Sequence, residues 1–477
     1  MNKLFSRISL FAAILALAAC GNKSNDILST IPADAEIIVR VDAEKILESA
    51  GCTIDDGQWT PGAGVERMRD ALTSGMRDDI DNLLAAMPAV DAQNIYFHTY
   101  KSRPCVTVGV KHPGIMADAL EKEFGKPETK DGFQSYGHGI LLRDDMLWIT
   151  NDSHALAESL DAAKKSSASS DKIFDKAFGS RSDDALTVVC NYATLLRANP
   201  YVAYSGVIGM MSDKYIAYGM KFKGNSAIID GGVYSADGEI FKAGGLVAPV
   251  DDTFTKLLPA NTLLAFAFGR PDEEITDQII DQMGARVKSE VKPFVDALDG
   301  TFALAVAPPA DFSNLLKLSE WTFTMAVQYK KNKADEIIAF AESFKDQGAN
   351  VSELSDQVLI SVPGGIGYLN PANFYLGYFN GMLVASTRRI SADNDNDFKR
   401  YFNGYYSAAF LDVPADGDIV KGLHLPFGLK STMKCDDENY VSEITLDGSK
   451  SPFIESIINA ATDRAMQREV AEALSKL

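Results

Sequence analysis

Residues 31–42 read IPADAEIIVRVD, and residues 258–269 read LPANTLLAFAFG. Each stretch contains a Pro-Ala pair, a short connection, and then a run in which every second residue is bulky and apolar. That period-2 spacing is typical of a β-strand that packs one of its faces. The residues predicted to share the packed face are Ile37, Val39 and Val41 in the first run, and Leu264, Phe266 and Phe268 in the second. The two stretches therefore predict the same strand, built twice.

The similarity continues downstream, with the same kinds of element in the same order. A helix-like segment follows each strand, at residues 43–50 and 272–283. Two strands, a helix, a hairpin, a further helix, a strand and a closing hairpin then follow in both halves. The matching tripeptides Val90-Asp91-Ala92 and Val295-Asp296-Ala297 are interpreted as the lead into the second strand.

The central hairpin is the clearest of the shared elements. In the second half its strands, 375–379 and 382–387, are joined by Asn380-Gly381, the favoured pair for a two-residue type I′ turn. In the first half Asp144-Asp145 takes the same place. Strict alternation of residue types along 321–329 favours antiparallel sheet over buried parallel sheet.

These patterns predict an α+β protein of two tandem duplicated domains, each a mainly antiparallel sheet with helices packed on one face. The predicted boundaries are a signal peptide (1–19), a lipidated cysteine and tether (20–30), a first repeat domain (31–250) and a second repeat domain (251–477). Chance similarity between two α+β domains is the alternative interpretation.

The N-terminus predicts a membrane address. Lys3 and Arg7 precede an apolar segment, and small residues lead to Cys20. This arrangement is typical of a bacterial lipobox, in which the chain is cut before the cysteine and its thiol receives lipid. An ordinary secretory signal with an incidental cysteine is one alternative. A retained transmembrane anchor is another, but about 12 apolar residues are too few to cross about 30 Å of hydrocarbon. Lipidated Cys20 is therefore the predicted anchor.

With this lipobox, the polar tether 21–26 and the 31–34 start of the first strand, the chain resembles lipoproteins of unassigned function from Gram-negative gut anaerobes of the Bacteroides type. The resemblance implies location and architecture, and no catalytic activity. Gly21 is not the aspartate that is linked with inner-membrane retention, so the outer membrane is favoured. Asp26 is opposed by Lys23, which favours the periplasmic face over display at the cell surface.

Composition excludes some partners. The chain is 46% hydrophobic and 23% charged, which is typical of globular protein. Its formal net charge is −19, so nucleic acid is not an expected partner. Beyond Cys20, the disulfide pairing of four cysteines is left open: Cys52, Cys105, Cys190 and Cys435. Cys105 and Cys190 lie in strand-like runs, where a cysteine often acts as a small buried hydrophobe.

The sequence shows no motif of a catalytic site, a metal site or a cofactor site. Histidines lack metal-ligand spacing, and no nucleophile elbow or phosphate-binding loop occurs. His98 and His138 are the least unsuited to a histidine-dependent site. Residues 393–397 resemble the start of a calcium loop, but Phe398 occupies the position that needs glycine, and Gly404 the one that needs glutamate.

One apolar segment is a candidate surface for a partner or ligand, and its key residues are Tyr201, Tyr204, Met210 and Met211. A buried connector is the alternative interpretation of that segment. The sequence thus favours a non-enzymatic binding or scaffolding component of the cell envelope. Its expected partners are the membrane, through the lipid on Cys20, and an envelope protein or apolar ligand. The alternative is a hydrolase acting on envelope or dietary polymers.

Overall fold

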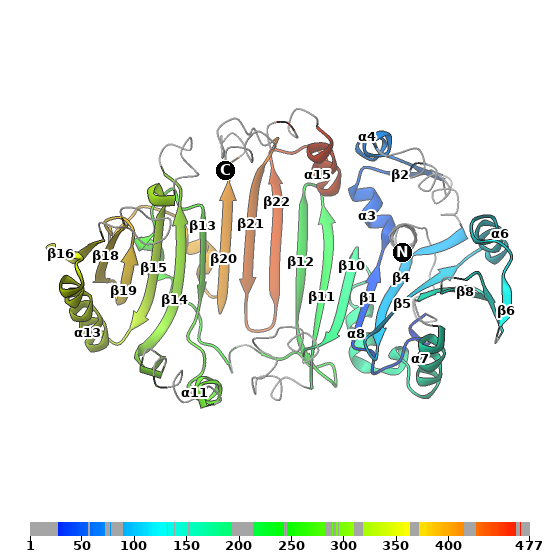
Figure 1. Cartoon of the computed structure of the whole chain (residues 1–477), viewed down its shortest axis with the longest axis horizontal. Coiled ribbons are helices and arrows are strands. Elements are labelled where there is room, and N and C mark those ends of the chain that lie inside the picture. Colours follow the sequence, from blue (N-terminus) through cyan, green and yellow to red (C-terminus); the bar gives the residue numbers. More distant parts are fainter. Residues whose placement is uncertain are drawn as a thin grey trace. The chain divides into compact units, whose positions relative to one another are not determined.

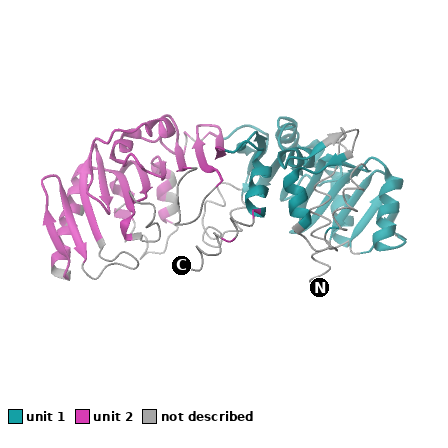
Figure 2. Ribbon diagram, turned by 90° about the horizontal axis from the view of Figure 1, so that it is seen from above, with its two compact units in different colours: residues 1–241, 449–462 teal, residues 242–448, 463–477 magenta. Residues whose placement is uncertain are grey.

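The chain divides into two compact units in a computed structural model (Figures 1 and 2). Unit 1 comprises Met1–Phe241 and Ser449–Thr462, and unit 2 comprises Lys242–Gly448 and Asp463–Leu477. The structure describes residues 27–55, 58–71, 77, 89–130, 132–137, 139–150, 153–192, 213–242, 244, 246–281, 289, 292–293, 295–309, 318–362, 372–414, 426–463 and 468. Both units are α+β, with antiparallel sheet, as the sequence predicts.

Unit 1 is built on an antiparallel sheet with strand order β12-β11-β10-β1-β4-β5-β9-β8-β7-β6. The strands are β1 (Ile37–Val41), β4 (Val90–Tyr100), β5 (Arg103–Val110), β6 (Glu128–Lys130), β7 (Phe133–Ser135), β8 (Ile140–Arg143), β9 (Met146–Thr150), β10 (Leu186–Asn191), β11 (Lys214–Lys223) and β12 (Ser226–Ser235). A separate small hairpin joins β2 (Thr53–Asp55) and β3 (Gln58–Thr60). The helices are α3 (Ala43–Ser49), α4 (Ala63–Ala71), α6 (Pro113–Phe124), α7 (Ser153–Lys165), η2 (Ala168–Ser170), α8 (Lys172–Gly179) and, from the far end of the chain, α15 (Phe453–Thr462).

Helices cover both faces of this sheet. Ile95 packs against α3 and α6, whereas the next residue, Tyr96, points to the other face and meets Phe178 of α8 at 5.7 Å between ring centroids. Trp148 lies on that second face too, beneath Leu156 and Leu160 of α7. The expectation of helices on one face is therefore wrong. The central strands carry apolar side chains on both faces, so both faces need a cover.

Unit 2 pairs its strands in the order β22-β21-β20-β13-β14-β15-β19-β18-β17-β16, all antiparallel. These strands are β13 (Leu264–Phe268), β14 (Leu298–Ala307), β15 (Thr322–Tyr329), β16 (Asn350–Glu353), β17 (Gln357–Val362), β18 (Ala372–Phe379), β19 (Met382–Ser386), β20 (Ser407–Val413), β21 (Gly428–Cys435) and β22 (Tyr440–Asp447). The helices are η4 (Asp252–Leu257), α11 (Glu273–Asp281), η6 (Leu318–Glu320), α13 (Lys331–Glu342), η7 (Ser343–Gln347) and α14 (Lys399–Phe402). Read from β1 and from β13, the two pairing orders are the same.

The two faces of the unit 2 sheet differ in their cover. On one, a layer of alanines that includes Ala265 and Ala267 packs beneath Phe254 of η4 and Phe402 of α14. On the other, α13 covers the region around Val327. Beyond that cover this face exposes large apolar side chains at Leu264, Phe268, Leu304 and Met325.

Several local predictions are confirmed. Both central hairpins turn at the expected residues, and Asn380 and Gly381 have the positive φ angles, 50° and 81°, of a type I′ turn. The match of Val90-Asp91-Ala92 with Val295-Asp296-Ala297 is wrong. The first tripeptide lies within β4, opposite β5, whereas residues 295–297 are helical and β14 begins at Leu298. Identical letters here stand in different secondary structure.

Candidate functional site

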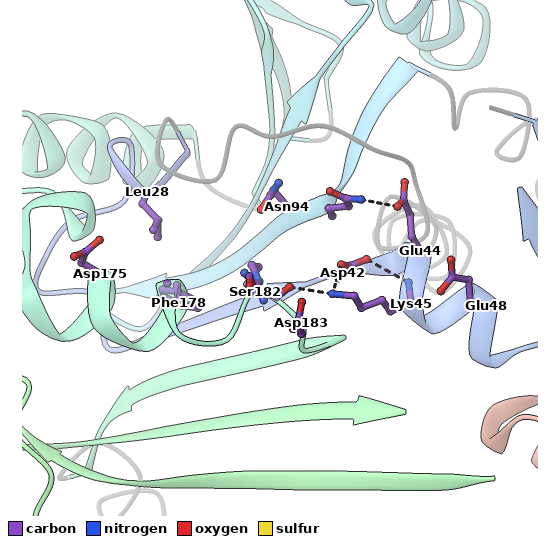
Figure 3. A pocket seen from close by; sticks show the side chains of 13 residues that line it. Leu28, Asp42, Glu44, Lys45, Glu48, Asn94, Asp175, Phe178, Ser182 and Asp183 are labelled. Carbon is purple, nitrogen blue, oxygen red and sulfur yellow. Dashed lines mark hydrogen bonds and ion pairs between the residues drawn. The ribbon is translucent and has the colours of Figure 1, made fainter. Parts of the chain in front are cut away.

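A polar pocket of about 470 Å³ lies in unit 1 where β1 ends and α3 begins (Figure 3). Glu44 and Glu48 of α3 stand at one end of it, and Asp175 and Phe178 of α8 at the other. Its ionisable lining residues are Arg40, Asp42, Glu44, Lys45, Glu48, Asp175 and Asp183. Five carboxylates and two cations therefore line this one small pocket.

The strand and its capped helix place these groups. Alternation along β1 turns Arg40 toward the face that α8 covers, where 5% of it is exposed. Asp42 is the N-cap of α3, and its carboxylate accepts a hydrogen bond from the Lys45 backbone N–H at 3.2 Å. The first turn of the helix then carries Glu44 and Lys45, with Glu48 one turn later on the same side as Glu44.

Arg40 is a buried cation without a carboxylate partner among the residues that the structure describes. Its Nη2 donates to the carbonyl oxygen of Arg181, to that of Asp184 at 3.5 Å and to the Thr187 hydroxyl at 3.4 Å. Its Nε has no partner. A guanidinium keeps its charge in proteins, and buried charges are normally paired. The wall of the pocket thus holds a buried cation that forms no ion pair with any described residue.

Lys45, the other cation, already has its partners. Its Nζ lies 3.2 Å from the Asp42 carboxylate and donates to the Ser182 carbonyl at 2.9 Å. These contacts link α3 to the chain that follows α8 (Figure 3). Glu44 is partnered too, because its carboxylate accepts from Gln93 Nε2 at 2.7 Å. Asp42, Glu44 and Lys45 therefore form a preorganised wall.

Burial raises the pKa of several carboxylates at this end of the sheet, and the negative charge of neighbouring carboxylates adds to it. The carboxylate of the otherwise exposed Glu48 is partly buried, and this partial burial, followed by the negative charges of Glu44 and Asp42, raises its pKa. Burial also raises the pKa of Asp42, against the opposing hydrogen bond from Lys45. Asp91 of β4, 2% exposed, has its pKa raised to about 6 by burial, although its carboxylate accepts from Asn94 Nδ2 at 3.2 Å.

A second and smaller pocket, of about 290 Å³, lies in unit 2 where β13 ends. It is lined by Arg270 and Glu273, which form an ion pair with each other, and by Tyr406. Its arginine is thus compensated, which distinguishes it from the pocket of unit 1.

The residues that the sequence singled out lie elsewhere. Cys20, Tyr201, Tyr204, Met210 and Met211 fall outside the described residues, as does His138. His98 is 1% exposed on the face that α7 covers, where Nε2 lies 3.4 Å from the Ser159 hydroxyl and Nδ1 has no partner among the described residues. Burial lowers the pKa of His98 to about 4, so the imidazole is neutral at pH 7.

The cysteines with an open pairing are free thiols: Cys52, Cys105, Cys190 and Cys435. Burial raises the pKa of Cys105 to about 12 and that of Cys190 to about 11, so neither is a thiolate at neutral pH.

Residues 393–397, the segment that resembles the start of a calcium loop, hold η4 of unit 2 in place through hydrogen bonds. Asn396 Nδ2 donates to the carbonyl oxygens of Thr255 and Leu258, each at 3.0 Å, and Asn394 Nδ2 donates to that of Lys256 at 3.2 Å. The amides thus secure η4 above the alanine layer. Within the described parts of the chain, no group of three or more His, Cys, Asp or Glu residues could hold a metal ion.

The pocket residues are not among those that the sequence pattern singles out, although the sequence carries one signal of them. Arg40 interrupts an otherwise apolar strand and is followed closely by Asp42, Glu44 and Lys45. The second half has Ala267 at the same place in its strand, between Phe266 and Phe268. A charge in a strand whose counterpart has none is the pattern that could have revealed the site.

No family model, curated protein or solved structure matches this chain. Among the described residues, no helix is both long enough and apolar enough to span a bilayer.

Proposed function

We propose that this protein is a lipid-anchored lipoprotein of the cell envelope that binds a small polar ligand in the unit 1 pocket. The observation that carries the ligand site is Arg40, a residue 5% exposed whose guanidinium has no carboxylate partner in the described structure, at the wall of a preorganised cavity. Leaving such a charge buried and unpaired is costly, and a bound ligand offsets that cost. The role is binding, not catalysis.

The anchor part of the proposal rests on the lipobox that ends at Cys20. It assigns the protein to the outer membrane, facing the periplasm. Substitution Cys20→Ala is expected to move the protein from the membrane pellet to the soluble fraction, because several acyl chains hold it there. Recovery of the variant wholly in the pellet would overturn the anchor. Degradation of the wild type by protease added to intact cells would instead indicate the cell surface.

We also propose that the two units arose by duplication of one α+β domain. The support is the shared pairing order and the equal place of the bulge, which lies between Asp91 and Ile95 in β4 and between Leu298 and Phe302 in β14. Superposition of 30–247 on 257–448 in an experimental structure tests this proposal. Failure to superpose strand by strand would leave chance similarity.

The ligand proposal is tested by native mass spectrometry of the full-length protein purified from its own membrane. A small molecule retained by the wild type and absent from Arg40→Met is the expected result. Asp161→Asn, an exposed substitution on α7, is the matched control and should retain the ligand. A ligand retained equally by Arg40→Met would show that the unit 1 pocket is not the site.

A further inference from the structure

We infer that the ligand of the unit 1 pocket is a small zwitterion, with its anionic group at Arg40 and its cationic group at the carboxylates of the pocket rim. This inference rests on the proposed ligand-binding function and adds the chemical class of the ligand. Two sets of unpaired charges of opposite sign carry it.

The first set is the buried guanidinium itself. Every hydrogen bond that Arg40 makes leaves from Nη2 and ends on a carbonyl or hydroxyl oxygen, so none of them neutralises the charge. Within the described residues it forms no ion pair. Arg and a carboxylate or phosphate pair strongly because the planar fork of donors matches two oxygens. An anionic group is therefore the expected partner of Arg40.

The second set lies at the mouth of the pocket. Glu48, Asp175 and Asp183 are exposed, line the cavity and form no ion pair with any residue that the structure describes. They differ from Asp42 and Glu44, which are buried and already bonded to Lys45 and Gln93. The three rim carboxylates are free to accept an ammonium group.

Together the two sets exclude ligands of a single charge. A simple anion that approached Arg40 would pass three carboxylates, and their repulsion opposes its entry. A simple cation would pair with the rim and leave the guanidinium uncompensated. A ligand that carries both charges satisfies both sets. The volume, about 470 Å³, suits a molecule of the size of an amino acid or a dipeptide.

The test is isothermal titration calorimetry on the full-length protein with matched probes. Norvaline carries both charges, pentanoate lacks the amine, and butylamine lacks the carboxylate. We expect norvaline to bind at least tenfold more tightly than either half. Alanylalanine and phosphoethanolamine are two further zwitterions. Whichever of the three zwitterions binds most tightly indicates whether the natural ligand is a free amino acid, a peptide or a phosphate-bearing headgroup.

Variants assign the two charges to their places. Arg40→Met is expected to abolish zwitterion binding, and Arg40→Lys to restore part of it. Should Arg40→Met fail to fold, the rim variant Glu48→Gln/Asp175→Asn/Asp183→Asn changes only exposed side chains. This triple variant is expected to bind norvaline at least tenfold more weakly than the wild type and to bind pentanoate no more weakly. Asp161→Asn is expected to leave the affinity for both compounds unchanged.

The outcomes separate this inference from the proposed function. Pentanoate binding as tightly as norvaline would overturn the zwitterion and leave a polar-ligand site in place. A natural ligand seen by mass spectrometry that is not a zwitterion would do the same. If no probe binds and no small molecule copurifies, the proposed function itself falls.

Discussion

Strands β1 and β13 stand at the same place in the pairing order of their units, yet the layers around them are opposite in chemistry. Arg40 of β1 lies between Tyr96 and Thr187 on the neighbouring strands. Ala267 of β13 lies between Ala303 and Ala408. One unit uses this layer to hold a polar pocket, and the other fills it with small side chains beneath phenylalanine rings.

The opposite face of the same strands differs too. Val41 packs against the core formed with α3 and α6, whereas Phe268 is 37% exposed and stacks on Phe302 at 5.1 Å between ring centroids. A single strand pattern thus supports a polar pocket in one unit and an apolar surface in the other. Side-chain choice, not topology, sets what each unit offers.

The largest effect on the free energy of unfolding is expected from placing an arginine, as found at position 40 of β1, in the layer of buried alanines of unit 2. Ala267→Arg places a guanidinium in a fully buried position beneath Phe254 and Phe402, so we expect a loss of about 4 kcal/mol or more in the free energy of unfolding. Urea denaturation measures it. Phe268→Arg, one residue along the strand on the exposed face, is the control and should cost less than about 1 kcal/mol. Equal losses would show that the two faces do not differ.

The next effect concerns pH and is confined to unit 1. His98 has a folded pKa of about 4 and an unfolded value of 6.5. Between these pH values the unfolded state binds more protons than the folded state. The contribution of neutral His98 to the free energy of unfolding is therefore complete above pH 6.5, and about 3 kcal/mol of it is lost as pH falls toward 4. Asp91, whose folded pKa is raised to about 6, acts in the opposite direction over much of this window.

Substitution His98→Gln isolates the histidine. The variant should gain about 3 kcal/mol relative to wild type between pH 7 and pH 4, measured by urea unfolding at both pH values. Asp91→Asn should instead lose free energy of unfolding relative to wild type between pH 7 and pH 4. A constant difference between wild type and His98→Gln across this range would mean that the imidazole is not buried neutral.

Removing the charge from β1 is expected to have a smaller effect of unusual sign. Arg40→Met replaces an unpaired buried cation with an apolar side chain of similar length. The free energy of unfolding of the ligand-free protein should be unchanged or raised by up to about 2 kcal/mol. A loss of more than about 2 kcal/mol would show that groups of the protein already compensate the guanidinium.

The smallest effect compares the two central hairpins. Gly381 has a φ of 81°, whereas in the turn Asp144-Asp145 only Asp144 has a positive φ, of 52°. Gly381→Ala should therefore cost about 1 kcal/mol and Asp145→Ala less than about 0.5 kcal/mol, by the same denaturation assay. A larger cost for Asp145→Ala would contradict the difference in turn type.

Much of the fold could be predicted because its signals are local. Alternation of apolar residues specified where the strands lie, and the Asn380-Gly381 pair specified a turn, since each depends only on neighbours in the chain. The predicted packed face of β13 is wrong, because Ala265 and Ala267 are buried whereas Leu264 and Phe268 are exposed. The predicted match between the tripeptides that begin at Val90 and Val295 is wrong, because identical residues do not determine the register of a strand. Register is decided by which strand lies opposite.

The pocket could not be predicted because it depends on contacts between distant segments. That Arg40 is charged is plain from the sequence, but whether it meets a carboxylate depends on 181–187, about 140 residues away. The helices on both faces of the sheet are likewise a result of packing. The sequence by itself determined the strands, the turns and the net charge, and it carries the pattern before Cys20 on which the proposed lipid anchor rests. Only the tertiary structure decided which charges are buried and which of them lack a partner, because burial is a property of the assembled layers and not of the chain.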